Sequence, residues 1–85
     1  MPEISRFLGI IVFMVYDDHN PPHFHAKYGD YEISVEIMSG IVEGTFPRRA
    51  LAALLEWRQL HQGELKEDWE LARSHEPLKL IEPLE

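Results

Sequence analysis

The sequence predicts an α+β domain, namely a four-stranded antiparallel β-meander followed by two helices packed on one face of the sheet. Before Pro47, short runs rich in Ile, Val, Phe and Tyr are separated by turn residues, which is typical of strands. After Pro47, apolar residues recur at helical spacing. The 85 residues contain no repeat or linker. We therefore expect one domain over residues 1–85, with a β half at residues 1–46 and a helical half with a C-terminal tail at residues 47–85.

The charge and composition of the chain argue against several classes of protein. The formal net charge is −7, and Lys and Arg form no separate basic tail or stripe. Because nucleic-acid binders draw most of their non-specific affinity from cations that neutralise phosphates, direct nucleic-acid binding is not expected. The chain has no cysteine, so any metal must be held by His, Asp or Glu. The absence of cysteine fits a cytoplasmic protein, which we expect here.

The most apolar run lies at residues 7–16, and residues 10–16 are predicted to form the first strand. The run is too short to span a bilayer, which takes about 20 residues, so no membrane association is expected. Unlike a half-exposed strand, residues 10–16 are apolar on both sides. We assign Val12 and Val15 to the second face. A second copy of the chain, another partner, or the C-terminal segment at residues 78–84 is expected to cover it.

Residues 23–36 carry the clearest hairpin signal. Gly29-Asp30 is a two-residue turn of the Gly-X kind, which fixes the register of the strands on either side. The apolar face then pairs Tyr28 with Tyr31, Ala26 with Ile33, and Phe24 with Val35. The polar face pairs Lys27 with Glu32, His25 with Ser34, and His23 with Glu36. Because the two alternating patterns agree, we predict this register for the central hairpin.

A second turn at Ser39-Gly40 is predicted to lead into the fourth strand. This turn pairs Ile37 with Val42, Ile33 with Phe46, Ser34 with Thr45, and Glu36 with Glu43. A polar row of His23, Glu36 and Glu43 would then cross three strands. Facing carboxylates repel each other, and a neighbouring charged imidazole would relieve that repulsion.

The helical half is predicted to contain two helices. In the first, Pro47 suits the first helical position and Gly63 suits the residue after the end. The second is predicted over residues 64–75, because Glu76 precedes a proline and therefore avoids helical dihedral angles. The apolar stripes expected to face the sheet comprise Ala50, Leu51, Ala53, Leu54, Leu55, Trp57 and His61, then Leu65, Trp69 and Ala72.

Three histidines within seven residues, in the segment HNPPHFH at residues 19–25, form the candidate site. In a structural interpretation, the two prolines stiffen the connection between two strands and Asp17 or Asp18 caps the turn. The histidines then pair with polar neighbours on the sheet. This interpretation explains the prolines but only part of the histidine pattern.

A metal-binding interpretation uses His23 and His25, which project from the same side of a strand. Glu36 would be a ligand from the neighbouring strand, and His19 or Asp17 would complete the site from the loop. Imidazole and carboxylate ligands at this reach suit zinc or another divalent ion.

A catalytic interpretation makes His23 and His25 an acid and a base, with Lys27 as a cation that stabilises phosphate. A metal-independent ribonuclease needs such a set. Charge argues against it, since the chain is acidic and Glu32 is predicted to face Lys27. For other classes of enzyme, the sequence shows no P-loop, no Gly-rich dinucleotide turn, and no identifiable pair of nucleophile and base.

Several segments resemble the bacterial domain-of-unknown-function family numbered 4160. They are residues 1–32, with YDDHNPPHFHA followed by YG, then PRRALAALLEW, and W-x-L-A-R before EPLKLIEPL. The resemblance runs almost end to end and implies no catalytic or binding residue. It does imply a genetic context, because such proteins are often encoded beside another small protein in an arrangement similar to a toxin–antitoxin module.

We therefore expect a protein-interaction component of a two-gene, toxin–antitoxin-like module. Its partner would be a small protein encoded nearby, or a second copy of the chain bound through residues 10–16. The alternative is a metal-dependent or histidine-based nuclease that uses the HNPPHFH segment.

Overall fold

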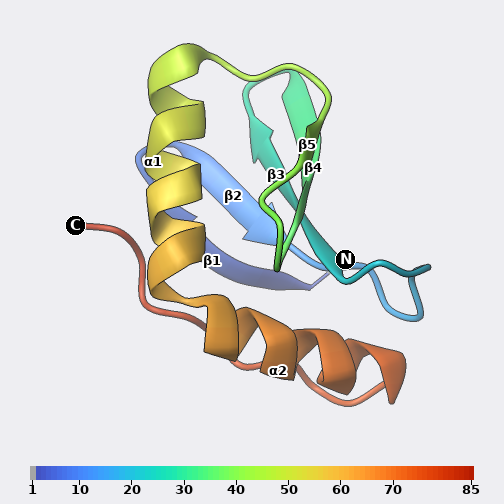
Figure 1. Ribbon diagram of the computed structural model, residues 1–85. Coiled ribbons are helices and arrows are strands. Elements are labelled where there is room, and N and C mark those ends of the chain that lie inside the picture. Colours follow the sequence, from blue (N-terminus) through green and yellow to red (C-terminus); the bar gives the residue numbers. More distant parts are fainter. Residues whose placement is uncertain (1) are drawn as a thin grey trace.

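The chain forms a five-stranded antiparallel sheet followed by two helices in the computed structural model, which describes residues 2–85 (Figure 1). The strands lie side by side in chain order: β1 (Glu3–Phe7), β2 (Ile10–Phe13), β3 (His23–Tyr28), β4 (Tyr31–Glu36) and β5 (Val42–Glu43). The helices are α1 (Arg48–Leu60) and α2 (Gln62–Arg73). The predicted α+β class and antiparallel meander are confirmed, with one strand more than expected.

The additional strand is β1, at the edge of the sheet beside β2. Leu8 and Gly9 connect the two strands, and both have positive φ, at 51° and 81°. Two-residue hairpin turns need such angles and normally use Asn, Asp or Gly to reach them. Because Leu8 takes the first position, the usual turn signal is missing from the sequence. β2 itself ends at Phe13 rather than at the predicted Tyr16.

The central hairpin has the predicted register. All six expected pairs of β3 and β4 are present, from His23 opposite Glu36 to Tyr28 opposite Tyr31. The turn at Gly29 uses a positive φ of 59°. This hairpin therefore places His23 and His25 on the sheet as the alternation of apolar and polar residues predicted.

The predicted register of β4 and β5 is wrong by two residues. Ser34 pairs with Glu43, and Val35 pairs with Val42. The predicted register instead paired Ser34 with Thr45, Ile33 with Phe46, Glu36 with Glu43, and Ile37 with Val42. Glu36 and Ile41 close a four-residue turn, 37–40, because the Glu36 N–H donates to the Ile41 carbonyl at 2.9 Å and the Gly40 N–H donates to the Glu36 carbonyl at 3.0 Å. A shift of two keeps every side chain on its predicted face but separates Glu43 from Glu36.

The helices also differ from the prediction at their junction. Pro47 is the N-cap of α1 rather than its first residue, and α1 ends at Leu60. α2 begins at Gln62, so Gly63 lies inside α2 and does not end α1. His61 separates the two helices with non-helical angles (φ −124°, ψ 27°). The chain turns at His61 because both apolar stripes must reach the same core.

One face of the sheet and the apolar stripes of both helices enclose that core. Its members include Ile10, Val12, Phe24, Ala26, Ile33 and Val35 from the sheet, with Leu54, Trp57, Leu65 and Trp69 from the helices. Trp57 is fully buried, as predicted, and its ring lies 5.4 Å from that of Phe7 and 5.8 Å from that of Phe24. These aromatic contacts fix α1 against the sheet.

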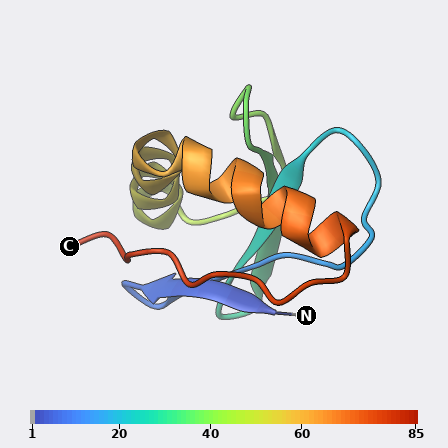
Figure 2. The ribbon, with the colours of Figure 1, turned by 90° about the horizontal axis from the view of Figure 1, so that it is seen from below.

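The C-terminal segment at residues 78–84 runs alongside β1 (Figure 2). The Ile81 N–H donates to the Ile4 carbonyl at 2.8 Å, and the Trp57 Nε1–H donates to the Glu82 carbonyl at 2.8 Å. Ile81 is buried in the core. The segment therefore covers the core beside β1 and does not cover the second face of β2.

The assignment of Val12 to the second face of β2 is also wrong. Val12 is fully buried in the core, where it pairs with Ala26. Phe13 is on the other face, and its ring stacks on that of His25 with centroids 5.3 Å apart. Part of the apolar surface of this strand therefore packs against the histidine cluster and does not need another chain to cover it. Within residues 2–85, no helix is long and apolar enough to cross a bilayer.

Candidate metal centre

Asp18, His23 and His25 converge on one point beside the start of β3. Both histidines come from β3, and Asp18 comes from the loop that connects β2 with β3. Asp18 Oδ2 lies 2.9 Å from His23 Nε2 and 3.2 Å from His25 Nε2. One atom from each residue lies within 4.8 Å of the other two. This set of two imidazoles and one carboxylate suits a divalent transition metal.

The second oxygen of the Asp18 carboxylate faces His19. The backbone N–H of His19 donates to Asp18 Oδ1 at 2.8 Å, and His19 Nδ1 lies 2.8 Å from the same oxygen. Burial by itself opposes ionisation of Asp18. The hydrogen bonds from His19 and His25, with the nearby His23, outweigh that effect and hold the pKa of Asp18 well below its usual range. Asp18 is therefore an anion at neutral pH.

The orientation of the His23 ring is fixed from its other side. His23 Nδ1 lies 2.8 Å from the carbonyl oxygen of Pro21. A carbonyl only accepts hydrogen bonds, so Nδ1 must carry a proton and donate it. The neutral ring then presents a lone pair at Nε2, toward Asp18. Metal-binding histidines are commonly oriented by a contact of this kind.

Aromatic rings surround the two histidines of β3. The ring of Trp69, from α2, lies 5.3 Å from that of His23, and the ring of Phe13 stacks on His25. His23 is only 7% exposed, although it belongs to the polar set of the hairpin. These contacts restrict ring rotation and exclude water from one side of the cluster.

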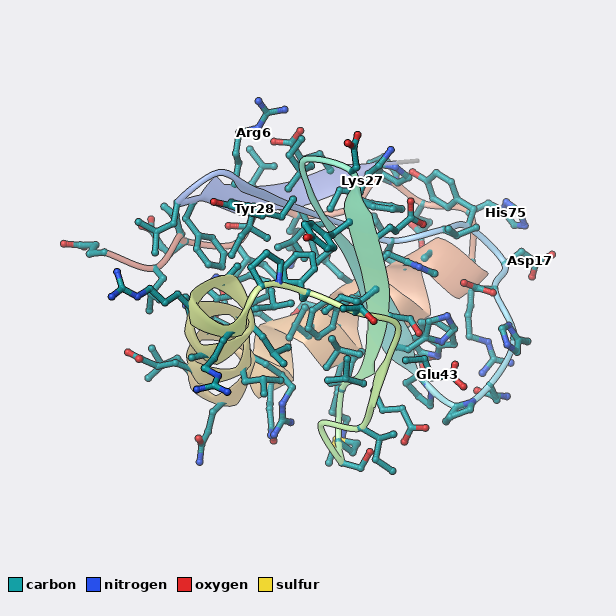
Figure 3. The ribbon with its side chains drawn as sticks, turned by 90° about the horizontal axis from the view of Figure 1, so that it is seen from above. Arg6, Asp17, Lys27, Tyr28, Glu43 and His75 are labelled. Atoms are coloured by element: carbon teal, nitrogen blue, oxygen red, sulfur yellow. The ribbon has the colours of Figure 1, made fainter. Side chains whose placement is uncertain are left out.

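The loop that carries Asp18 is attached to the end of α2. The Asp17 N–H donates to the Ala72 carbonyl at 3.3 Å, and Asp17 has a positive φ of 58°. Its carboxylate points outward, 3.7 Å from His75 Nε2, and is 73% exposed (Figure 3). The structure therefore brings Asp18, and not the predicted Asp17, to His23 and His25.

A pocket of about 280 Å³ opens beside the cluster. It is lined by His19, Pro21, His23, His25, Ser34, Glu36, Ile41 and Glu43. Glu36 is in this lining, but its Oε1 accepts a hydrogen bond from Ser39 Oγ at 2.6 Å, and it is not among the three converging ligands. Lys27, the predicted phosphate-stabilising cation, is exposed and lies outside the lining, well apart from Glu43 in Figure 3.

A row of paired residues across the sheet forms the base of this pocket. His25 pairs with Ser34, and Ser34 pairs with Glu43. This row replaces the predicted row of His23, Glu36 and Glu43. Because serine is small, space remains above it between the imidazole of His25 and the carboxylate of Glu43.

Sequence reasoning identified the two histidines of β3 but not their carboxylate partner. The interpretation above gives Asp18 only a role in capping the turn. Asp17 and Asp18 are adjacent and chemically identical, so no local signal distinguishes them. The distinction comes from the contact of the loop with α2.

The fold and the site define a small α+β protein with a carboxylate–histidine cluster beside a polar pocket. The family model described as domain of unknown function (DUF4160) matches residues 9–70, and the chain belongs to this family. The matched region includes Asp18, His23 and His25. Neither a curated protein nor a solved structure matches the chain.

Proposed function

We propose that the protein binds a divalent transition-metal ion such as zinc through Asp18, His23 and His25. The observation that carries this proposal is the double contact of the His23 ring. Its Nδ1 donates to Pro21, so its Nε2 is an acceptor in the neutral ring, yet Nε2 lies 2.9 Å from a carboxylate oxygen. Two acceptors at this distance repel each other unless a positive charge lies at Nε2 or between them. A metal ion supplies that charge; a proton on Nε2 would also supply it, but it would not produce a response to added metal at pH 8.

The distances between the ligand atoms support the same conclusion. Zinc bonds to nitrogen and oxygen ligands of about 2.0–2.2 Å place neighbouring ligands of a tetrahedral site about 3.3–3.6 Å apart. The observed separations of Asp18 Oδ2 from the two Nε2 atoms are 2.9 and 3.2 Å. A small outward movement of the ligands therefore makes room for the ion.

Three protein ligands leave a fourth position for water or a substrate, as in catalytic zinc sites. The adjoining pocket gives that position access to small molecules. This arrangement supports the metal-dependent branch of the nuclease hypothesis more than the metal-independent one, because Lys27 lies outside the pocket. The class of reaction that such a site would support is metal-assisted hydrolysis, in which the ion would activate a bound water.

Metal binding is tested on protein purified without a histidine tag and then stripped with a chelator. Titration with Zn²⁺ at pH 8 should raise the thermal unfolding midpoint, with a stabilisation of about 2.7 kcal/mol when free metal is 100 times Kd. Co²⁺ should produce the visible absorption bands of a tetrahedral site. Asp18→Asn and His25→Gln should each lose both effects.

Two variants serve as controls for this experiment. Asp17→Asn removes the neighbouring exposed carboxylate, and His61→Gln removes a histidine that pairs with Glu64 elsewhere. Both should bind metal like the natural sequence. Equal responses from Asp17→Asn and Asp18→Asn, or no response in the natural sequence, would refute the proposal.

A role as the interaction component of a two-gene module in the cytoplasm is a second proposal. Two apolar side chains in the loop between β4 and β5 support it, because Met38 and Ile41 are each 58% exposed. Single exposed apolar residues are ordinary, whereas two within one short loop favour contact with a partner. Co-expression with the product of the adjacent gene should yield a complex that Met38→Ser with Ile41→Ser weakens. Co-purification unchanged by both substitutions would contradict this assignment of the interface.

A further inference from the structure

The pocket beside the metal centre has an acidic lining. Glu36 and Glu43 both contribute to it, and the Asp18 carboxylate contacts two of its lining residues, His23 and His25. Among the described residues that line it, none is a lysine or an arginine. A bound divalent ion would neutralise only two of these three negative charges. The loaded site therefore keeps a net negative charge.

This charge balance determines which ligands suit the site. A phosphodiester or another polyanion would gain from the metal but would be repelled by Glu36 and Glu43 on the opposite wall. A cationic group would be attracted to those carboxylates, and its hydrogen bonds to them would be charge-assisted. The row from His25 through Ser34 to Glu43 places a proposed metal ligand and a carboxylate on either side of the serine.

Two apolar residues complete the lining. Pro21 and Ile41 both line the pocket, and Ile41 is 58% exposed. Such walls suit the methylene chain that usually carries an amine or a guanidine group. The volume of about 280 Å³ is at the small end of ligand pockets, which favours a small molecule over a polymer.

We infer that the pocket binds a small ligand with a metal-coordinating group at one end of an aliphatic chain and a cationic amine or guanidine at the other. The coordinating group occupies the open position of the metal, and the cation lies against Glu43 and Glu36. This inference rests on the proposed metal site. It predicts that the natural ligand is not a nucleic acid, so metal-assisted hydrolysis at this site would act on a small molecule and the nuclease alternative would fall.

The test uses protein saturated with Co²⁺ and two matched probes. ε-Aminocaproic hydroxamic acid carries both a chelating group and an amine, and caproic hydroxamic acid lacks the amine. Perturbation of the Co²⁺ absorption bands measures the affinity of each. The amine probe should bind several-fold more tightly, because its ammonium gains a charge-assisted hydrogen bond to the exposed Glu43 carboxylate.

Glu43→Gln should remove most of this difference between the probes. Glu32→Gln is the matched control, since Glu32 is exposed on β4 opposite Lys27 and lies outside the pocket lining. It should keep the difference. Equal affinity for both probes in the natural sequence, or displacement of the amine probe by inorganic phosphate at similar concentration, would overturn the inference and leave metal binding intact.

A second measurement separates this inference from the metal proposal. In metal-free protein, hexylamine should shift the NMR signals of Ser34 and Glu43, and hexanol should not. If Co²⁺ does not bind but the hexylamine effect is present, the metal proposal fails and the cation site stands. If hexylamine and hexanol behave alike, the cation site is wrong.

Discussion

The imidazole of His75 stacks on the phenol ring of Tyr16, with ring centroids 6.0 Å apart and planes inclined by 13°. His75 follows the C-terminus of α2, and Tyr16 begins the turn that carries Asp18. The Asp17 N–H adds a hydrogen bond to the last turn of α2. The end of a helix distant in the sequence therefore holds the loop that supplies the carboxylate ligand.

Removing this stack should weaken metal binding without unfolding the protein. His75 has a positive φ of 57°, so His75→Gly relieves backbone strain while it deletes the ring. We expect a several-fold loss of Co²⁺ affinity, because Asp18 is less well held, and faster amide hydrogen exchange in residues 16–19. His75→Phe keeps an aromatic ring against Tyr16 and should retain most of the affinity. Unchanged affinity and exchange in His75→Gly would show that the stack does not position the loop.

The buried carboxylate of Asp68 should make stability depend on pH. Burial raises the pKa of Asp68, partly opposed by the hydrogen bond that it accepts from the Lys79 N–H at 2.9 Å. Because the folded pKa exceeds the unfolded value of about 3.9, its favourable contribution is complete below that value and is lost as pH rises through the folded pKa. Asp68→Asn keeps an acceptor oxygen and should remove this dependence.

Urea denaturation across the acidic range, from below the unfolded pKa up to neutral pH, measures that effect. At pH 7, Asp68→Asn should be at least as stable as the natural sequence. Asp68→Ala leaves the Lys79 N–H without its acceptor and should lose about 1–3 kcal/mol. A large loss of stability in Asp68→Asn at pH 7 would mean that the ionised carboxylate is needed in the folded state.

Val12→Asp should unfold the chain rather than dissociate an oligomer. Val12 is fully buried between the sheet and the helices, so the substitution places a carboxylate in an apolar core at a cost of several kcal/mol. Val15→Asp, at a partly exposed position, should fold. Circular dichroism and light scattering of both variants measure fold and mass together. A folded Val12→Asp variant of reduced mass would restore the oligomer interpretation.

Gly44 should tolerate alanine less well than Gly29 does. Both glycines have positive φ, at 109° and 59°. A Cβ atom at Gly44 would lie 2.9 Å from the Glu32 carbonyl oxygen and 2.9 Å from Ile33 Cγ2, whereas at Gly29 no described atom outside its chain neighbours lies within 4 Å. Gly29→Ala should cost about 1–2 kcal/mol in unfolding free energy. Gly44→Ala should cost more and should shift the NMR signals of Glu43, and equal costs would contradict the observed packing of β5.

Local sequence determined the features that depend on neighbouring residues. The alternation around Gly29-Asp30 was sufficient for the six pairs of β3 and β4, because a tight turn and a two-sided pattern allow only one register. The same alternation placed His23 and His25 together on the polar face. The helical spacing around Trp57 identified its burial in the core.

Only the tertiary structure decided the features that depend on distant contacts. The hydrogen bond between Glu36 and Ile41 closes a turn of four residues, 37–40, between β4 and β5. Arg58 of α1 donates to the Ile37 carbonyl in this turn at 2.6 Å, and the local sequence does not predict that contact. Asp18 rather than Asp17 faces the histidines because α2 binds the backbone of the loop at Asp17. Turn propensities and side-chain alternation act over a few residues, whereas these positions depend on how the helices pack against the sheet.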